Sequence, residues 1–173
     1  MPLTLVQRKT LETMALGLLF VGCAAFLEPA YKLLYNPSVS APIGLYLFKP
    51  AQQFRVGAYV LARLPEPIET LASQRHYLPS DVPILKHVGA LPGQSVCRER
   101  DLITVDGILV AHALERDRAG RKLPQWSGCY TLKTDQLFLL STDNPHSFDS
   151  RYFGPISTSA VLGLALPFWT REP

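Results

Sequence analysis

The sequence predicts a mainly β domain preceded by one N-terminal membrane helix, and three observations support this fold class. An uncharged, mostly apolar stretch lies near the N-terminus. After Pro37 the chain consists of short apolar or alternating runs separated by turn residues, which is the pattern of successive strands. The 173 residues include 15 prolines and 11 glycines and are 47% hydrophobic, which favours a loop-rich β fold with a sizeable core over a helical bundle.

The apolar stretch runs from Thr13 to Leu27 and follows two basic residues at positions 8 and 9. As a helix it would extend roughly 22 Å, short of the ~30 Å hydrocarbon core, unless Lys32 and nearby tyrosines lie at the interface. We interpret residues 13–31 as an uncleaved anchor, residues 1–12 as a cytoplasmic N-terminus, and residues 36–173 as an exported domain. A cleaved export signal and a buried core helix are the alternatives.

The exported region contains several candidate strands and two candidate insertions. Asp106-Gly107 separates two of the strands and is a strong signal for a two-residue hairpin. Residues 64–83 and 114–127 are polar or proline-rich, so we expect them to be insertions between strands. The expected strands are Gly44–Phe48, Gly57–Ala62, Ile84–Ala90, Ser95–Arg98, Leu102–Val105, Ile108–Ala111, Leu137–Ser141 and Val161–Leu166.

Charge and cysteine content exclude several function classes. The net charge is only +3 and no stripe of basic and aromatic residues is present, so we expect no nucleic-acid partner. Cys97 and Cys129 form an even pair in the exported part, where a disulfide is the natural interpretation, with two separate thiols as the alternative. No Cys-x-x-Cys or Cys/His cluster occurs, so we expect neither a metal site nor a cofactor.

Lys86 is the candidate general base. It lies in the mainly apolar segment 83–93, and burial there would lower its pKa from the ordinary value of about 10.4. The alternative is that Lys86 points to solvent from its strand. His87 and His146 lie in the two most motif-like segments, so a Ser-His-Asp triad also stays open.

Two further segments carry polar side chains that could belong to a functional site. Residues 141–155 are mostly polar and follow an apolar strand, and Asp149 and Arg151 lie two apart, so both can face one side of an extended segment and pair. Residues 36–46 form a serine-bearing turn just after the apolar stretch.

In this order the three segments resemble the type I signal peptidases, and most closely the TraF-type peptidases of bacterial conjugative transfer. Ser40 to Tyr46 is similar to that family's Ser-x-Pro-x-Gly-Leu-Tyr, and Leu85 to Gly93 to the signal-peptidase Lys-Arg-Val-x-Gly-x-Pro-Gly. The stretch from Ser147 to Gly154 resembles Ser-x-Asp-Ser-Arg-Tyr-x-Gly, the most specific of the three. The serine-to-proline spacing is one residue shorter than in housekeeping signal peptidases, which favours the TraF branch.

The resemblance implies a signal-peptidase-like β domain and a serine peptidase. Ser40 would be the nucleophile, Lys86 the general base and Asp149 a catalytic aspartate. Ser147 would hydrogen-bond the lysine, and Arg151 would pair with Asp149 to hold the wall of the site.

Ser38 has two possible roles under the same resemblance. Its hydroxyl would join the Ser40 backbone N–H as an oxyanion donor. Ser38 as the nucleophile is the alternative, although only Ser40 places Pro42 and Gly44 where the family pattern has them.

The resemblance also implies the substrate and the compartment. The expected partner is a pilin or another membrane-bound precursor, cut beside small residues at the bacterial inner membrane by a periplasmic peptidase domain. The acyl group would pass either to water or to the precursor's own N-terminal amine. A general type I signal peptidase and a non-catalytic, membrane-tethered pilus-assembly protein are the alternatives.

Overall fold

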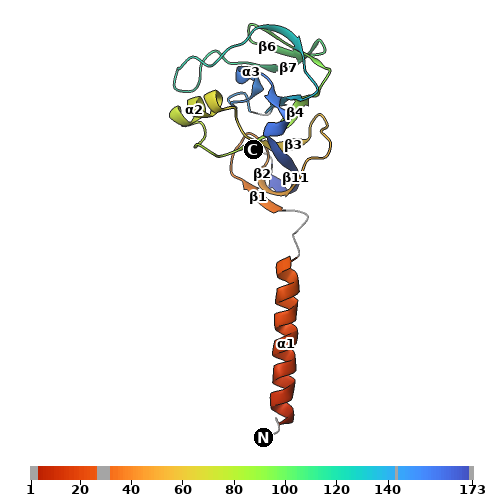
Figure 1. Cartoon of the computed structure of the whole chain (residues 1–173). Coiled ribbons are helices and arrows are strands. Elements are labelled where there is room, and N and C mark those ends of the chain that lie inside the picture. The colour runs from red at the N-terminus through yellow and green to blue at the C-terminus, as the bar shows by residue number, and fades with distance from the viewer. Residues whose placement is uncertain (1–3, 27–31, 143, 172–173) are drawn as a thin grey trace. The chain divides into compact units, whose positions relative to one another are not determined.

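The computed structural model describes residues 4–26, 32–142 and 144–171 (Figure 1). Contacts divide the chain into two units, Met1–Tyr31 and Lys32–Pro173. The first unit holds helix α1 (Leu5–Phe26). Within the described ranges, no helix combines the length and the apolar character needed to cross a membrane. The expected anchor over residues 13–31 begins inside α1, and its residues 27–31 lie outside the described part of the chain.

The second unit is built mainly from antiparallel strands, which confirms the mainly β prediction. One sheet has seven strands in the order β1-β2-β11-β3-β4-β9-β10, and the other has four in the order β7-β6-β5-β8. The strands of the larger sheet are β1 (Lys32–Asn36), β2 (Ile43–Lys49), β3 (Tyr59–Ala62), β4 (Ile84–Ala90), β9 (Gln136–Leu140), β10 (Ile156–Ser157) and β11 (Val161–Arg171). Those of the smaller sheet are β5 (Ser95–Glu99), β6 (Leu102–Val105), β7 (Ile108–His112) and β8 (Gly128–Thr131).

Strand β9 explains how the core is arranged. Leu137 and Leu139 pack into one apolar cluster, whereas Phe138 and Leu140 pack into another. Successive strand side chains point to opposite faces, so β9 is buried on both faces, as its continuous apolar run requires. β9 therefore provides a buried support for the residues that follow it.

The β6–β7 hairpin confirms the turn predicted at Asp106-Gly107. Val105 pairs with Ile108, and the two residues between them have φ angles of 49° and 81°. Positive φ at both central positions is the requirement of a type I′ turn, which glycine meets without strain and aspartate tolerates.

The structure corrects the sequence interpretation where elements are short or begin at prolines. The supposed insertion 64–83 contains helix α2 (Glu66–Gln74), which begins directly after Pro65 and buries Ala72 against the core. Proline is well tolerated in the first turn of a helix, because no N–H is needed there. A second helix, α3 (Ser150–Phe153), and the short strands β8 and β10 were also missed.

In the larger sheet, the first and the last strands along the chain also extend beyond the predicted elements. β1 occupies residues 32–36, and the sequence interpretation placed the first four of these between anchor and domain. β11 continues past Leu166 to Arg171, and the irregularity between Pro167 and Trp169 accommodates a residue that cannot donate a ladder hydrogen bond. β1 and β11 pair with β2 on its two sides, which fixes the start of the turn that carries Ser40.

Candidate active site

Ser40 lies in the loop that joins β1 to β2, and Asn36 holds this loop together. The Asn36 side chain is buried and donates to the carbonyl oxygens of Ser38, Ala41 and Pro42 at 3.0, 3.2 and 3.2 Å. Its own carbonyl oxygen accepts from the backbone N–H of Ser38 at 3.1 Å. One amide thus occupies the interior of the loop and sets its backbone conformation.

The glycine of the Ser-x-Pro-x-Gly pattern has a clear structural reason. Gly44 has φ 143°, and a Cβ at this position would collide with the backbone carbonyl of Trp169 on the neighbouring strand. Tyr46, completely buried, donates its hydroxyl proton to the Pro42 carbonyl at 2.5 Å. The motif residues after Ser40 therefore position the loop against the sheet.

Lys86 lies in β4 on the same face as Ile84 and Val88, and it is only 4% exposed. Burial lowers its pKa from 10.5 to about 8, partly offset by the negative charge of Asp149. The alternative of a solvent-facing lysine is therefore excluded by the structure. Desolvation of this kind is what a lysine needs to act as a base near neutral pH.

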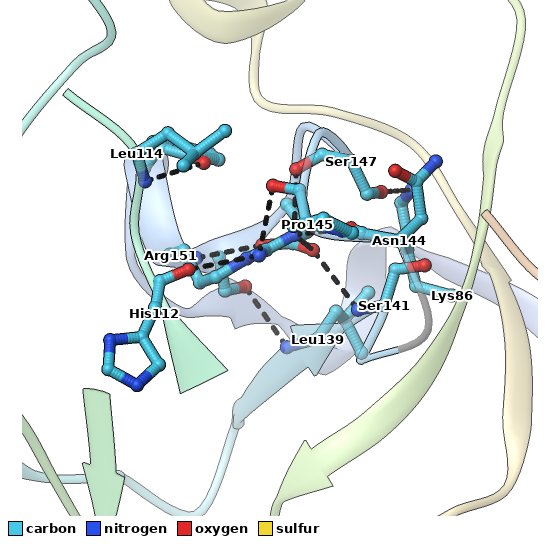
Figure 2. Close-up of polar contacts among 12 residues, drawn as sticks. Lys86, His112, Leu114, Leu139, Ser141, Asn144, Pro145, Ser147 and Arg151 are labelled. Atoms are coloured by element: carbon cyan, nitrogen blue, oxygen red, sulfur yellow. Dashed lines mark hydrogen bonds and ion pairs between the residues drawn. The ribbon is translucent and has the colours of Figure 1, made fainter. Parts of the chain in front are cut away.

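Ser147 connects the lysine to Ser40. The Lys86 Nζ donates to the Ser147 hydroxyl, and this hydroxyl donates to Ser40 Oγ at 3.1 Å. Figure 2 shows Ser147 beside the end of the Lys86 side chain, with a dashed line between them. Three segments that are far apart in sequence are thereby joined in a continuous hydrogen-bonded chain.

Asp149 and Arg151 form a buried, bidentate ion pair. Arg151 Nε and Nη2 each donate to one carboxylate oxygen of Asp149 at 2.8 Å, and the two side chains are almost completely buried. Burial alone would lower the pKa of Arg151, but the hydrogen bonds and charge of Asp149 raise it, so the guanidinium stays charged. No hydrogen bond of the described residues joins Asp149 to Ser40 or Lys86 directly, so its contacts are those of a positioning residue.

The remaining donors of Arg151 fix the loop that carries Ser147. Nη2 donates to the carbonyl oxygens of Asn144 and Ser147 at 3.1 and 2.9 Å, and Nη1 donates to that of Pro145 at 3.2 Å. Figure 2 shows these bonds converging on Arg151. The ion pair therefore acts on the site through the backbone of residues 144–147.

Ser141 was not singled out from the sequence, yet it connects the ion pair to the nucleophile loop. Its backbone N–H donates to Asp149 Oδ2 at 3.0 Å, and its hydroxyl donates to the backbone carbonyl of Ser40. Asn36 was also missed. A polar residue directly after an apolar strand, and an asparagine opening the serine motif, were the available signals.

Ser38 is exposed, and its hydroxyl is already engaged. It donates to the Asn36 side-chain carbonyl at 2.8 Å, so the hydroxyl must rotate before it can act as an oxyanion donor. The backbone N–H of Ser40 donates to no acceptor among the described residues, which leaves it available for an oxyanion.

The two candidate histidines lie in different surroundings, one in a strand and one in an exposed loop. His87 follows Lys86 in β4, so its side chain points to the opposite face, where its ring contacts that of Tyr59 edge-on at 6.2 Å. His146 is exposed in the loop before Ser147. The hydrogen bond to Ser40 Oγ comes from Ser147.

Cys97 and Cys129 form a disulfide between β5 and β8, as directly paired residues with Cα atoms 4.0 Å apart. It lies in the smaller sheet, and neither cysteine lines the cavities beside Ser40. The disulfide therefore belongs to the scaffold of the domain.

Two cavities open onto Ser40. The first has a volume of about 300 Å³ and is lined by Lys86 together with apolar residues that include Leu34, Leu61 and Ile84. The second has a volume of about 350 Å³ and is lined by Ser147 and by charged residues of the 114–123 loop. A chain passing Ser40 can therefore contact a mainly apolar cavity that holds the lysine and a second cavity that also carries charged side chains.

Comparison with known proteins identifies the family. Residues 7–169 match the family model described as signal peptidase, peptidase S26. Two plasmid transfer proteins TraF of Escherichia coli are 34% and 32% identical, covering 89% and 94% of this chain and 90% and 98% of their own length. A conjugal transfer protein TraF of Agrobacterium fabrum is 41% identical over 53% of this chain and 51% of its own. A signal peptidase I structure from Enterococcus faecalis is 17% identical with a TM-score of 0.40, covering 66% of this chain and 97% of that one. With the match extending over nearly the whole sequence, the chain belongs to the S26 signal peptidase family of serine peptidases.

Proposed function

We propose that the chain is a Ser/Lys endopeptidase that processes a pilin precursor for conjugative DNA transfer. The observation that carries this proposal is the hydrogen-bonded chain from buried Lys86 through Ser147 to Ser40. A lysine with a pKa of about 8 is neutral in roughly one molecule in ten at pH 7, against roughly one in three thousand at its ordinary value. Burial thus supplies a usable base.

The chemistry follows from the direction of these hydrogen bonds. When Lys86 is neutral, both hydroxyls can rotate so that Ser40 donates to Ser147 and Ser147 donates to the amine. Ser40 Oγ then attacks the substrate carbonyl, and its proton moves through Ser147 to Lys86. The backbone N–H of Ser40 stabilises the oxyanion, the amine leaves with the proton from Lys86, and an acyl-enzyme remains. Water or a second amine then resolves the ester.

The proposed substrate rests on the relatives. Proteins named for plasmid and conjugal transfer match this chain over 80% or more of its length. We therefore infer a precursor from the conjugation apparatus, and the resemblance to TraF-type peptidases points to the pilin. Both hydrolysis and transfer of the acyl group to the precursor's own N-terminus are compatible with the acyl-enzyme.

We place the enzyme at the inner membrane, with residues 13–31 as its anchor and the β domain in the periplasm. The disulfide is consistent with an oxidising compartment. An apolar patch, formed by Tyr35, Leu45 and Trp169 in register across β1, β2 and β11, supports contact with lipid, because Tyr35 and Trp169 are 60% and 77% exposed. Shared anchoring would raise the effective concentration of a membrane-bound precursor.

The test uses the full-length protein in detergent and a pilin precursor, with products weighed by mass spectrometry. We expect Ser40→Ala and Lys86→Arg to abolish processing, because arginine keeps the charge but does not deprotonate near neutral pH. His87→Ala and His146→Ala are the matched controls and should keep most of the activity. Loss of activity in either histidine variant, equal to that in Lys86→Arg, would refute the dyad. Product masses separate a cyclic product from a hydrolysed one.

A further inference from the structure

The second cavity beside Ser40 carries charges that the proposed mechanism does not use. Its walls include Ser40 and Ser147 together with Asp117, Arg118 and Arg121. Lys86 lines the first cavity and not this one. The 114–123 loop therefore shares a cavity with the nucleophile but not with the base.

Two of the three loop charges that line the cavity neutralise each other. Arg121 Nε donates to Asp117 Oδ2 at 2.7 Å, and the backbone N–H groups of Ala119 and Arg121 donate to Oδ1 at 2.9 and 2.8 Å. The Tyr77 hydroxyl also donates to this carboxylate. Burial alone would raise the pKa of Asp117. These hydrogen bonds lower it by more than burial raises it, so the pKa lies below its ordinary value and the carboxyl stays ionised. The pair is thus satisfied within the protein.

Arg118 remains as the uncompensated charge of the cavity. It is exposed, and no ion pair among the described residues includes it. Its backbone is held in a turn, because Gly120 N–H donates to the Asp117 carbonyl at 3.0 Å and Asp117 N–H to that of Arg121 at 2.9 Å. A cation is therefore presented from a fixed turn at the wall of a cavity that reaches Ser40.

The side of the substrate that enters this cavity follows from the proton path. The leaving amine must take its proton from Lys86, and the Lys86 Nζ reaches the second cavity through the Ser147 hydroxyl. The amine-side residues of the substrate should therefore leave through this cavity, and the acyl-side residues should occupy the apolar first cavity. This step rests on the proposed peptidase function.

We propose that the second cavity binds the amine-side residues of the substrate and that Arg118 selects an acidic side chain among the first few of them. A carboxylate is the group that a guanidinium recognises best, because two parallel N–H donors match its two oxygens. The neutralised Asp117–Arg121 pair leaves Arg118 as the charge that sets the preference.

The experiment uses full-length protein in detergent and a peptide library with alanine before the cleavage site and randomised residues after it. Mass spectrometry identifies the released amine-side products. We expect Asp and Glu to be enriched about twofold to fivefold over Lys and Arg, the effect of one exposed ion pair. Arg118→Ala should remove the enrichment, and Arg118→Glu should reverse it. Lys122→Ala, which removes an exposed lysine of the same loop outside the cavity, is the matched control.

The outcomes separate this inference from the proposed function. Cleavage by the unchanged protein without acidic enrichment would overturn the role of Arg118 and leave the peptidase intact. An enrichment that survives Arg118→Ala but is lost in Lys122→Ala would also overturn it. If the unchanged protein cleaves no library member and no pilin precursor, the proposed function itself fails and the inference fails with it.

Discussion

Replacing Lys86 by methionine should inactivate the protein and, at the same time, make it more stable. Methionine has a similar length and no charge, so it fits the apolar face between Ile84 and Val88. The protonated amine is disfavoured there, as its lowered pKa shows. A drop from 10.5 to about 8 corresponds to about 3 kcal/mol against the charged folded state. Loss of the hydrogen bond to Ser147 offsets about 1 kcal/mol of the gain.

The pH dependence has a definite sign. Below pH 8 the lysine is protonated in both folded and unfolded chains, so the folded state carries the full penalty. Between pH 8 and 10.5 the unfolded chain binds more protons than the folded one, so the free energy of unfolding rises with pH. The advantage of Lys86→Met should therefore be largest below pH 8 and should fade as the pH approaches 10.5.

Urea unfolding of the two proteins at pH 6.5 and pH 10 measures this difference. We expect Lys86→Met to be more stable by about 2 kcal/mol at pH 6.5 and by much less at pH 10. Lys133→Met, which removes an exposed lysine, should change the stability by less than about 0.5 kcal/mol at either pH. A Lys86→Met variant that is less stable at pH 6.5, or whose effect does not depend on pH, would refute the argument that desolvation supplies the base.

Three further predictions concern the scaffold of the site. Asn36→Ala should lower kcat by about 10²-fold with little change in KM, because the loop loses its internal hydrogen bonds and misplaces the nucleophile; an unchanged kcat would contradict this. Ser38→Ala should slow single-turnover acylation by about 10²–10³ if its hydroxyl rotates to the oxyanion, whereas a change below tenfold would restrict it to the hydrogen bond with Asn36. Reducing the Cys97–Cys129 disulfide should lower the free energy of unfolding by about 3–4 kcal/mol, and thiol labelling of the unfolded, unreduced protein should find only Cys23.

Most strands were predictable because local patterning determines them. The hairpin at Asp106-Gly107 and strand β4 follow from turn chemistry and apolar runs in a few adjacent residues. β8 could not be predicted in the same way, because three of its four residues are exposed and its strand character comes from pairing with β5. α2 was hidden because prolines at its start were interpreted as loop signals.

The residues of the candidate site also differ in how far local sequence patterns predict them. Ser40, Lys86 and Ser147 were found through short motifs, and the structure brings their side chains together. Asn36 and Ser141 were missed because their importance lies in contacts that no local pattern encodes. Ser141 reaches Ser40 across 101 residues of sequence. Asn36 is near Ser40 in sequence, but its burial depends on how the β1–β2 hairpin packs.

The buried ion pair is best understood through what it positions. Asp149 binds the Ser141 backbone, and Ser141 holds the carbonyl of Ser40. Arg151 holds the carbonyl groups of Pro145 and Ser147. A buried ion pair adds little net stability, because desolvation offsets most of the attraction, yet removing one partner leaves an uncompensated charge. The ion pair therefore serves to position other residues. It holds the backbone of the nucleophile, through Ser141, and the backbone of the serine that links nucleophile to base. Because Asp149 raises and Arg151 lowers the pKa of Lys86, the pair also leaves burial as the main control over the base.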